Sequence, residues 1–266
     1  MIKNIWTITL LIMSHTLITG CSTPQRPQLT ATMATIKPAI TATVSDPAWD
    51  KAATINGLSP CDKRASFQDS LNPTQIKVLW DAQYLYVRFI CDDDQIFTPH
   101  GSTRNGLHHE GDVTEVFIDP VGDGRQYVEV QVNPVGGVLD VMHTNTTPYR
   151  PNRTEVLPRE DWPMHIGVTE WQMPGLRTAA SIHTMDDGRK QWITDMAIPA
   201  KTLLRRVKTE TFSTMTMRIN FLRCDGPVDP ATGKRSQLIA SSWSHVPTGL
   251  PHLAPGTMGY ITLTDK

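Results

Sequence analysis

The chain has 266 residues, and its 25 lysine and arginine residues nearly balance its 26 aspartate and glutamate residues. The formal charge is −1 at pH 7, and no block of like charge stands out. The sequence therefore lacks the clustered basic surface that nucleic-acid binding requires, and we expect no nucleic-acid partner.

The first 20 residues have the features of a bacterial lipoprotein signal peptide. Lys3 supplies positive charge, and the mostly apolar run over residues 5–18 is too short and too interrupted to span a bilayer of roughly 30 Å. The segment ITGC at residues 18–21 resembles a lipobox, so we expect Cys21 to carry a lipid. An ordinary secretory signal with an incidental cysteine is the alternative. Ser22, where an aspartate would favour the inner membrane, predicts a lipid-anchored protein of the cell envelope at the outer membrane.

Residues 21–43 are predicted to form a lipidated flexible tether, because they are rich in Thr, Pro, Gln and Ala and show no clear period. The folded part is expected over residues 44–266. With no internal break in composition, this length favours a single domain.

Short strand-like runs dominate residues 44–266. They are rich in β-branched and aromatic residues and are separated by Gly, Pro, Asp and Asn. In chain order, the predicted strands are Gln75–Trp80, Tyr84–Cys91, Val113–Ile118, Tyr127–Val132, Val138–Met142, His165–Thr169, Arg177–His183, Trp192–Ile198, Thr216–Cys224, Leu238–Trp243 and Tyr260–Leu263. The best helix signal is residues 200–207, after Pro199. This pattern predicts an all-β fold, a single jelly-roll-like β-sandwich with one or two short helices.

Three cysteines remain for the folded part once Cys21 is lipidated. An oxidising compartment permits one disulfide among Cys61, Cys91 and Cys224. Cys91 and Cys224 both end apolar strand-like runs, so a disulfide between them is predicted. Buried free thiols that pack as small apolar side chains are the alternative.

Motifs along the chain resemble the family 9 carbohydrate-binding modules and their DOMON-like relatives. They occur in the family's order at residues 46–49, 77–81, 84–87, 110–119, 130–133, 197–199, 242–243 and 259–263. The resemblance runs from about Val44 to the C-terminus. It implies a non-catalytic β-sandwich that binds an oligo- or polysaccharide and works beside glycoside hydrolases. Relatives often hold the sugar ring between two tryptophans.

The resemblance also implies candidate ligand-binding residues. Glu115 falls on the family's hydroxyl-binding carboxylate, Asn133 on an asparagine beside the binding strand, and Gln131 where studied members have a cation. Glu115 also shares a strand face with Val113 and Phe117, so its charge should have a partner or a ligand. The alternatives are a salt bridge or solvated strand face for Glu115 and a turn for Asn133, which precedes a proline.

The two stacking tryptophans of the family are absent. His108 and His109 stand in place of the first, and the segment that ends in His252 stands in place of the second. Imidazole rings can stack on a sugar but offer less apolar area. Trp162 and Trp171 are candidate platforms, with core packing as the alternative.

Other chemistry is compatible with parts of the sequence. Asp119 and Asp123 could hold a structural Ca²⁺, as relatives do, or form a plain hairpin turn. Adjacent histidines on a strand point to opposite faces, so a metal site at His108 and His109 is not favoured. Glu110, Asp112 and Glu115 could suggest a glycosidase, but we expect no catalysis. A haem-binding electron-transfer domain of the DOMON type and a structural lipoprotein without a small ligand are the alternative functions.

Overall fold

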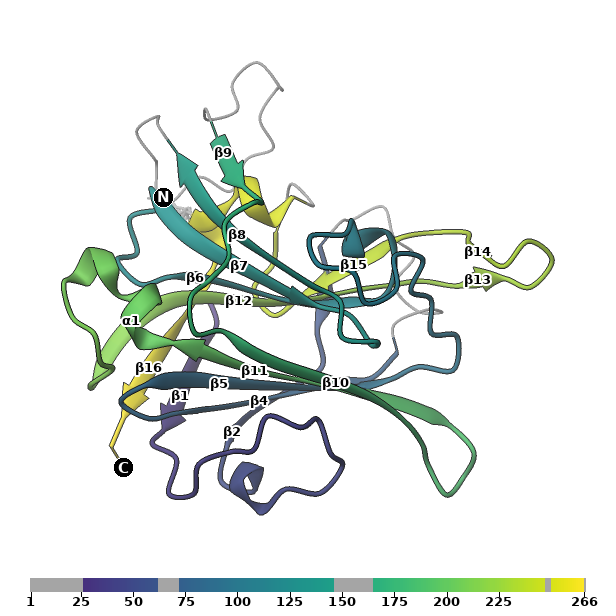
Figure 1. The fold of residues 1–266 in the computed structure, drawn as a ribbon, viewed down its shortest axis with the longest axis horizontal. Helices are drawn as coiled ribbons and strands as arrows, with labels where there is room; N and C mark the ends of the chain where they lie inside the picture. The colour runs from purple at the N-terminus through teal and green to yellow at the C-terminus, as the bar shows by residue number, and fades with distance from the viewer. Residues whose placement is uncertain (1–25, 62–71, 146–164, 247–249, 266) are drawn as a thin grey trace, which may run out of the picture.

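The computed structural model describes residues 26–61, 72–145, 165–246 and 250–265. Two antiparallel-dominated sheets face one another, as Figure 1 shows. The nine-stranded sheet contains β1 (Gln28–Thr32), β3 (Ser59–Pro60), β6 (Val113–Asp119), β7 (Gln126–Val132), β8 (Val138–Asn145), β9 (His165–Val168), β12 (Met215–Asp225), β15 (Ile239–Ser242) and β16 (Gly259–Thr264). The five-stranded sheet contains β2 (Ala53–Asn56), β4 (Thr74–Trp80), β5 (Tyr84–Asp92), β10 (Arg177–Thr184) and β11 (Lys190–Pro199).

The remaining elements are short. They are β13 (Val228–Asp229), β14 (Lys234–Arg235), α1 (Ala200–Leu203) and the 3-10 helices η1 (Pro47–Trp49), η2 (His108–Glu110), η4 (Arg205–Val207), η5 (Pro251–Leu253) and η6 (Pro255–Thr257). The predicted all-β sandwich is confirmed. Every predicted strand is present with bounds that differ by at most three residues, and α1 lies in the predicted helical segment. Among the described residues, no helix has the length and apolar character to cross a bilayer.

The main core lies between the two sheets. On β4, Ile76, Val78 and Trp80 all face it, as their alternation predicted. Phe89 of β5 and Phe221 of β12 meet across the layers with ring centroids 6.1 Å apart in an edge-to-face arrangement. Alternate residues of the nine-stranded sheet therefore point away from the five-stranded sheet, onto what we call the outer face.

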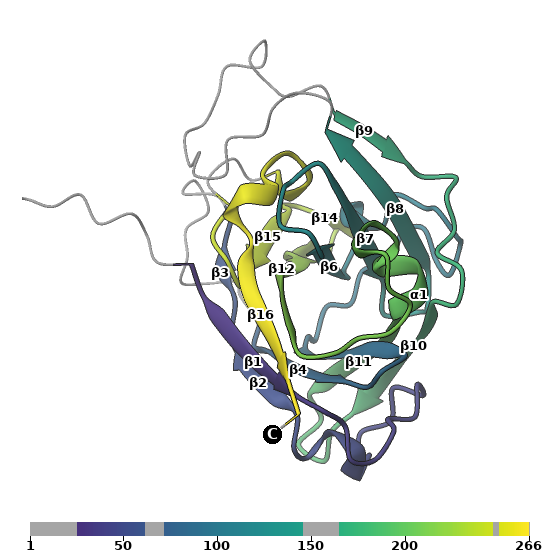
Figure 2. The same cartoon turned by 90° about the vertical axis from the view of Figure 1, so that its left-hand side faces the viewer.

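The predicted tether is wrong for residues 28–32. They form β1, which pairs in parallel with the C-terminal strand β16, as the purple and yellow strands of Figure 2 show. Ala31 is fully buried, and its carbonyl oxygen accepts a hydrogen bond of 3.1 Å from Trp80 Nε1. Because the partner strand lies more than 200 residues away, nothing local in this polar segment marks it as a strand.

The predicted disulfide is also wrong, because Cys91 and Cys224 are buried free thiols. Cys91 belongs to the core between the sheets. Cys224 lies on the outer face, where its thiol donates to Glu115 Oε1 at 3.6 Å. The two cysteines thus belong to different sheets and different faces, which the ends of two apolar runs cannot reveal.

Candidate functional site

Polar and aromatic side chains gather on the outer face. Strand alternation and register bring together six residues that we call the outer-face cluster: Glu115 of β6, Glu129 and Gln131 of β7, His143 of β8, His165 of β9 and His252 of η5. Glu115 lies opposite Gln131 in the ladder, and Tyr127 lies opposite His143. The cluster therefore draws on four neighbouring strands and one connecting segment.

A chain of hydrogen bonds runs through the cluster. Gln131 Nε2 donates to Glu129 Oε1 at 2.6 Å, and Glu129 Oε2 lies 2.7 Å from His143 Nε2. The other nitrogen of that ring, Nδ1, lies 2.8 Å from His165 Nε2. Glu129, Gln131 and His143 are 6%, 4% and 4% exposed, so these bonds form in a largely dehydrated environment where their directions are well defined.

Glu115 and Glu129 differ in protonation. Burial, and then the nearby charge of Glu129, raise the pKa of Glu115 to about 8, so it is a neutral acid at pH 7. Burial alone would raise the pKa of Glu129, but its hydrogen bond and charge interaction with His143 lower it. The face thus presents one carboxylic acid that can donate a hydrogen bond and one carboxylate that can only accept.

One acceptor of the cluster is unused. Gln131 Oε1 is buried and has no hydrogen-bond partner among the described residues. A buried polar atom in this state costs roughly 1–3 kcal/mol relative to one that is paired. Such an atom beside a neutral acid and a carboxylate is suited to a ligand that carries several hydroxyl groups.

Aromatic rings border the polar groups. The Tyr127 and His143 rings are nearly parallel, at 24°, with centroids 5.0 Å apart. His252 lies with its ring centroid 5.5 Å from that of His165, and its backbone oxygen accepts a hydrogen bond from Tyr127 Oη. Burial lowers the pKa of His252, and the electrostatic interaction with the exposed His109 also lowers it. His109 and His252, predicted to replace the stacking tryptophans, therefore lie near one another.

His108 and Asn133 have structural roles, and the prediction that they bind a ligand is not supported. Asn133 Oδ1 accepts from the backbone of Val135 and Gly137, and Asn133 Nδ2 donates to Gly101 O at 2.7 Å and lies 3.2 Å from His108 Nδ1. His108 Nε2 lies 3.0 Å from a backbone oxygen. These side chains use their hydrogen-bonding groups to hold a turn to a loop. The two adjacent histidines also lie in η2 rather than in a strand.

Asp119 and Asp123 do not fit Ca²⁺. Asp119 accepts backbone N–H groups of Gly122 at 2.8 Å and Gly124 at 2.7 Å, one on each oxygen. Asp123 pairs with Arg206 at 2.6 Å. A cation needs oxygens that face it free of donors, so the hairpin-turn alternative describes this loop.

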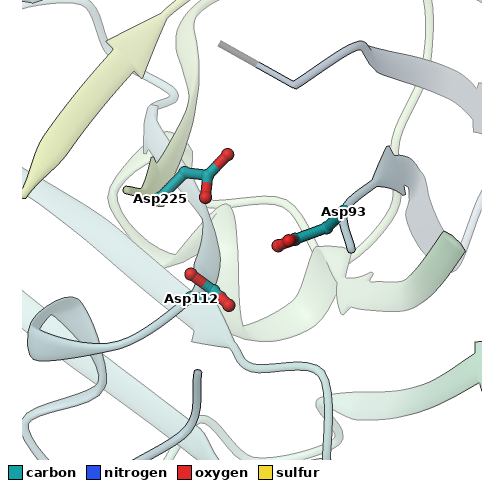
Figure 3. Close-up of side chains that lie close together, drawn as sticks. All are labelled: Asp93, Asp112 and Asp225. Atoms are coloured by element: carbon teal, nitrogen blue, oxygen red, sulfur yellow. The ribbon is translucent and has the colours of Figure 1, made fainter. Parts of the chain in front are cut away.

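A second acidic group is formed by Asp93, Asp112 and Asp225, whose carboxylates converge, as Figure 3 shows. Arg223 lies 3.1 Å from Asp93 and 3.0 Å from Asp225, and Arg235 pairs with Asp112. Three carboxylates thus face two guanidinium groups, and burial raises the pKa of Asp112 to about 7. Because backbone or side-chain donors reach the oxygens of all three, this group fits an ion-pair network better than a cation site.

The three carboxylates that suggested a glycosidase lie in different environments. Glu110 is exposed and pairs with His100 at 2.8 Å. Asp112 belongs to the ion-pair network, and Glu115 belongs to the outer-face cluster. They do not share one site at which an acid and a nucleophile could flank a glycosidic bond.

Glu129, His143 and His165 were not predicted as site residues. Glu129 shares a strand face with Gln131, so the alternation that placed Gln131 could have identified it. His143 becomes visible only through its cross-strand position opposite Tyr127. Of the two candidate tryptophans, Trp171 packs against the main core, and Trp162 lies outside the described residues.

The protein is thus an all-β sandwich that carries a polar and aromatic cluster on its outer face. The family described as "Carbohydrate family 9 binding domain-like" matches residues 40–266. The chain belongs to this family. Among curated proteins, none matches the chain.

Solved structures show the same fold. A candidate carbohydrate-binding protein from Bacteroides uniformis is 15% identical with a TM-score of 0.60, and the match covers 90% of this chain and 100% of that one. A family 9 carbohydrate-binding module from Caldicellulosiruptor kristjanssonii in complex with glucose is 13% identical, with a TM-score of 0.54 and coverage of 90% and 97%. The module from that organism in complex with cellotriose is 15% identical, with a TM-score of 0.55 and coverage of 90% and 95%.

Proposed function

We propose that the protein is a non-catalytic carbohydrate-binding module whose ligand is an oligo- or polysaccharide held on the outer face. The observation that carries this proposal is the buried, unpartnered Gln131 Oε1 beside Glu115 and Glu129. Family membership and the glucose and cellotriose complexes of similar structures support it.

The cluster has the groups that a sugar requires. Glu115, as a neutral acid, can donate to a hydroxyl oxygen, while Gln131 Oε1 and Glu129 accept from hydroxyl groups. The imidazole of His252 supplies a ring that can lie against the apolar face of a pyranose. We expect weaker stacking than with tryptophan, because imidazole has less apolar surface.

Replacing Gln131 with alanine tests the proposal. The substitution removes the Oε1 acceptor proposed to bind the sugar, and it removes the Nε2 donor that orients Glu129. We therefore expect the affinity for the sugar to fall about 10-fold or more. Calorimetry with glucose and cello-oligosaccharides measures the loss. Gln75→Ala, on the five-stranded sheet, is the matched control and should bind as wild type. Wild-type affinity in a folded Gln131→Ala variant would place the sugar elsewhere.

Anchoring through Cys21 is the second part of the proposal, and it places the module in the cell envelope beside glycoside hydrolases. The lipobox-like segment at residues 18–21 supports it. We expect Cys21→Ser to abolish incorporation of labelled palmitate and to move the protein from the membrane fraction to the soluble fraction. Ser22→Ala should keep the lipid. Palmitate incorporation by Cys21→Ser would refute the anchor.

A further inference from the structure

Three histidines of the outer-face cluster have a geometry that the sugar proposal does not require. The centroids of the His143 and His165 rings are 4.9 Å apart, while His143 Nδ1 and His165 Nε2 are 2.8 Å apart. A ring nitrogen lies only about 1 Å from its ring centroid, so a nitrogen separation of 2.8 Å within a centroid separation of 4.9 Å means that the rings meet edge to edge. One nitrogen of each ring therefore points at the other ring. Only one proton can lie between them.

We infer that His143, His165 and His252 bind a first-row transition-metal ion of the Zn²⁺ class. Two imidazole nitrogens that bind one tetrahedral Zn²⁺ lie roughly 3.3 Å apart with their lone pairs converging on the ion. The pair must therefore open by about 0.5 Å, and both rings must turn, to exchange the proton for a metal. His165 lies on β9, the terminal strand of its sheet, which among the described strands pairs with β8 alone. A shift of this size therefore leaves the central strands undisturbed.

The surroundings of His143 suit a metal ligand. Glu129 Oε2 lies 2.7 Å from the nitrogen that faces away from His165, and Gln131 in turn holds Glu129. A carboxylate behind a ligating imidazole fixes the ring and raises its basicity, so Glu129 would be a positioning residue. Its negative charge would also offset part of the charge of the metal.

The third histidine lies beside this pair. The His252 ring centroid lies 5.5 Å from that of His165 and 6.3 Å from that of His143. It belongs to η5, and its ring must move closer for all three histidines to bind one ion, because in the described part of the chain their nitrogens do not all lie within 4.8 Å of one another. Imidazole ligands favour Zn²⁺, Cu²⁺ or Ni²⁺ over Ca²⁺ or Mg²⁺.

Titration of the metal-free full chain with ZnCl₂ by calorimetry, without sugar, tests the inference. We expect one Zn²⁺ per chain, visible d–d bands of tetrahedral Co²⁺ on substitution, and at least 10-fold weaker binding in His165→Ala and His252→Ala. Glu129→Gln should weaken binding about 10- to 100-fold. His183→Ala, on β10 of the other sheet, is the control and should bind as wild type.

The variants separate a metal role from a structural one. His143 is buried, so a His143→Ala variant could fail to fold. His165 lies on a terminal strand, so His165→Ala tests the site without that risk. Wild-type Zn²⁺ affinity in folded His165→Ala and His252→Ala would overturn the site, as would equal weakening in His183→Ala. Sugar titration of the same variants in EDTA tests the outer-face sugar site separately, so either proposal can fail alone.

Discussion

Replacing Asp195 with alanine is expected to destabilise the protein by about 3–5 kcal/mol, because it leaves a buried guanidinium without its counter-charge. Asp195 accepts two hydrogen bonds from Arg88, at 2.7 and 2.9 Å, and their side chains are 0% and 2% exposed. Asp195 Oδ2 also accepts the backbone N–H of Ala42 at 2.8 Å. The substitution should therefore also release the segment that leads into the domain. Urea unfolding measures the loss, and hydrogen exchange reports the release.

A matched control uses an exposed aspartate. Asp187 pairs with Arg189 at 2.7 Å, but both side chains are more than half exposed, so Asp187→Ala should leave stability close to that of wild type. The double variant Arg88→Met/Asp195→Leu should recover much of the loss, since neither charge is then buried alone. An Asp195→Ala variant as stable as Asp187→Ala would contradict the assigned role of the ion pair.

Replacing Arg223 with methionine is expected to cost about 3–5 kcal/mol at pH 8, because it removes one of the two described arginines that pair with Asp93, Asp112 and Asp225 and leaves Arg235. The loss should depend on pH. Burial already raises the pKa values of Asp93 and Asp112, and removing a guanidinium raises them further.

The sign of this pH dependence follows from proton linkage. A carboxyl whose pKa is raised on folding stabilises the protein at low pH, and that contribution is lost as the pH rises through the folded-state pKa. Arg223→Met should therefore lie much closer to wild type at pH 5 than at pH 8 in unfolding experiments. Arg189→Met, which removes an exposed arginine, is the control. A loss that is the same at both pH values would show that the three carboxylates do not cause it.

The sequence predicted those features of the structure that depend on residues close to one another in the chain. Strand-like runs located most strands of both sheets, though not β1, β2 and β3, and alternation placed Ile76, Val78 and Trp80 on the buried side of β4. Motif order indicated the family that the match over residues 40–266 shows. Gln131 and Glu115 were predicted together, and the ladder places them opposite one another.

Predictions differ from the structure where the partner of a residue is distant in the chain, and they lose support where a loop uses the hydrogen-bonding groups of a polar side chain. Asn133 and His108 were predicted to bind a ligand, but Asn133 donates a hydrogen bond to the loop at Gly101 and lies within hydrogen-bond distance of His108. Cys91 and Cys224 were expected to pair, but Cys91 lies in the core between the sheets and Cys224 lies on the outer face beside Glu115. Residues 28–32 were assigned to a tether because their strand partner, β16, is at the other end of the chain.

The amino-acid order alone determined the fold class, an all-β sandwich, because strand periodicity and turn chemistry depend on residues a few positions apart. The order of its motifs indicated the family by resemblance. Only the tertiary structure decided what lies on the outer face. Glu129, His143, His165 and His252 come from three strands and a 3-10 helix, and their contacts form when those elements pack. Side-chain distances across a sheet depend on register and pairing, which local sequence does not specify.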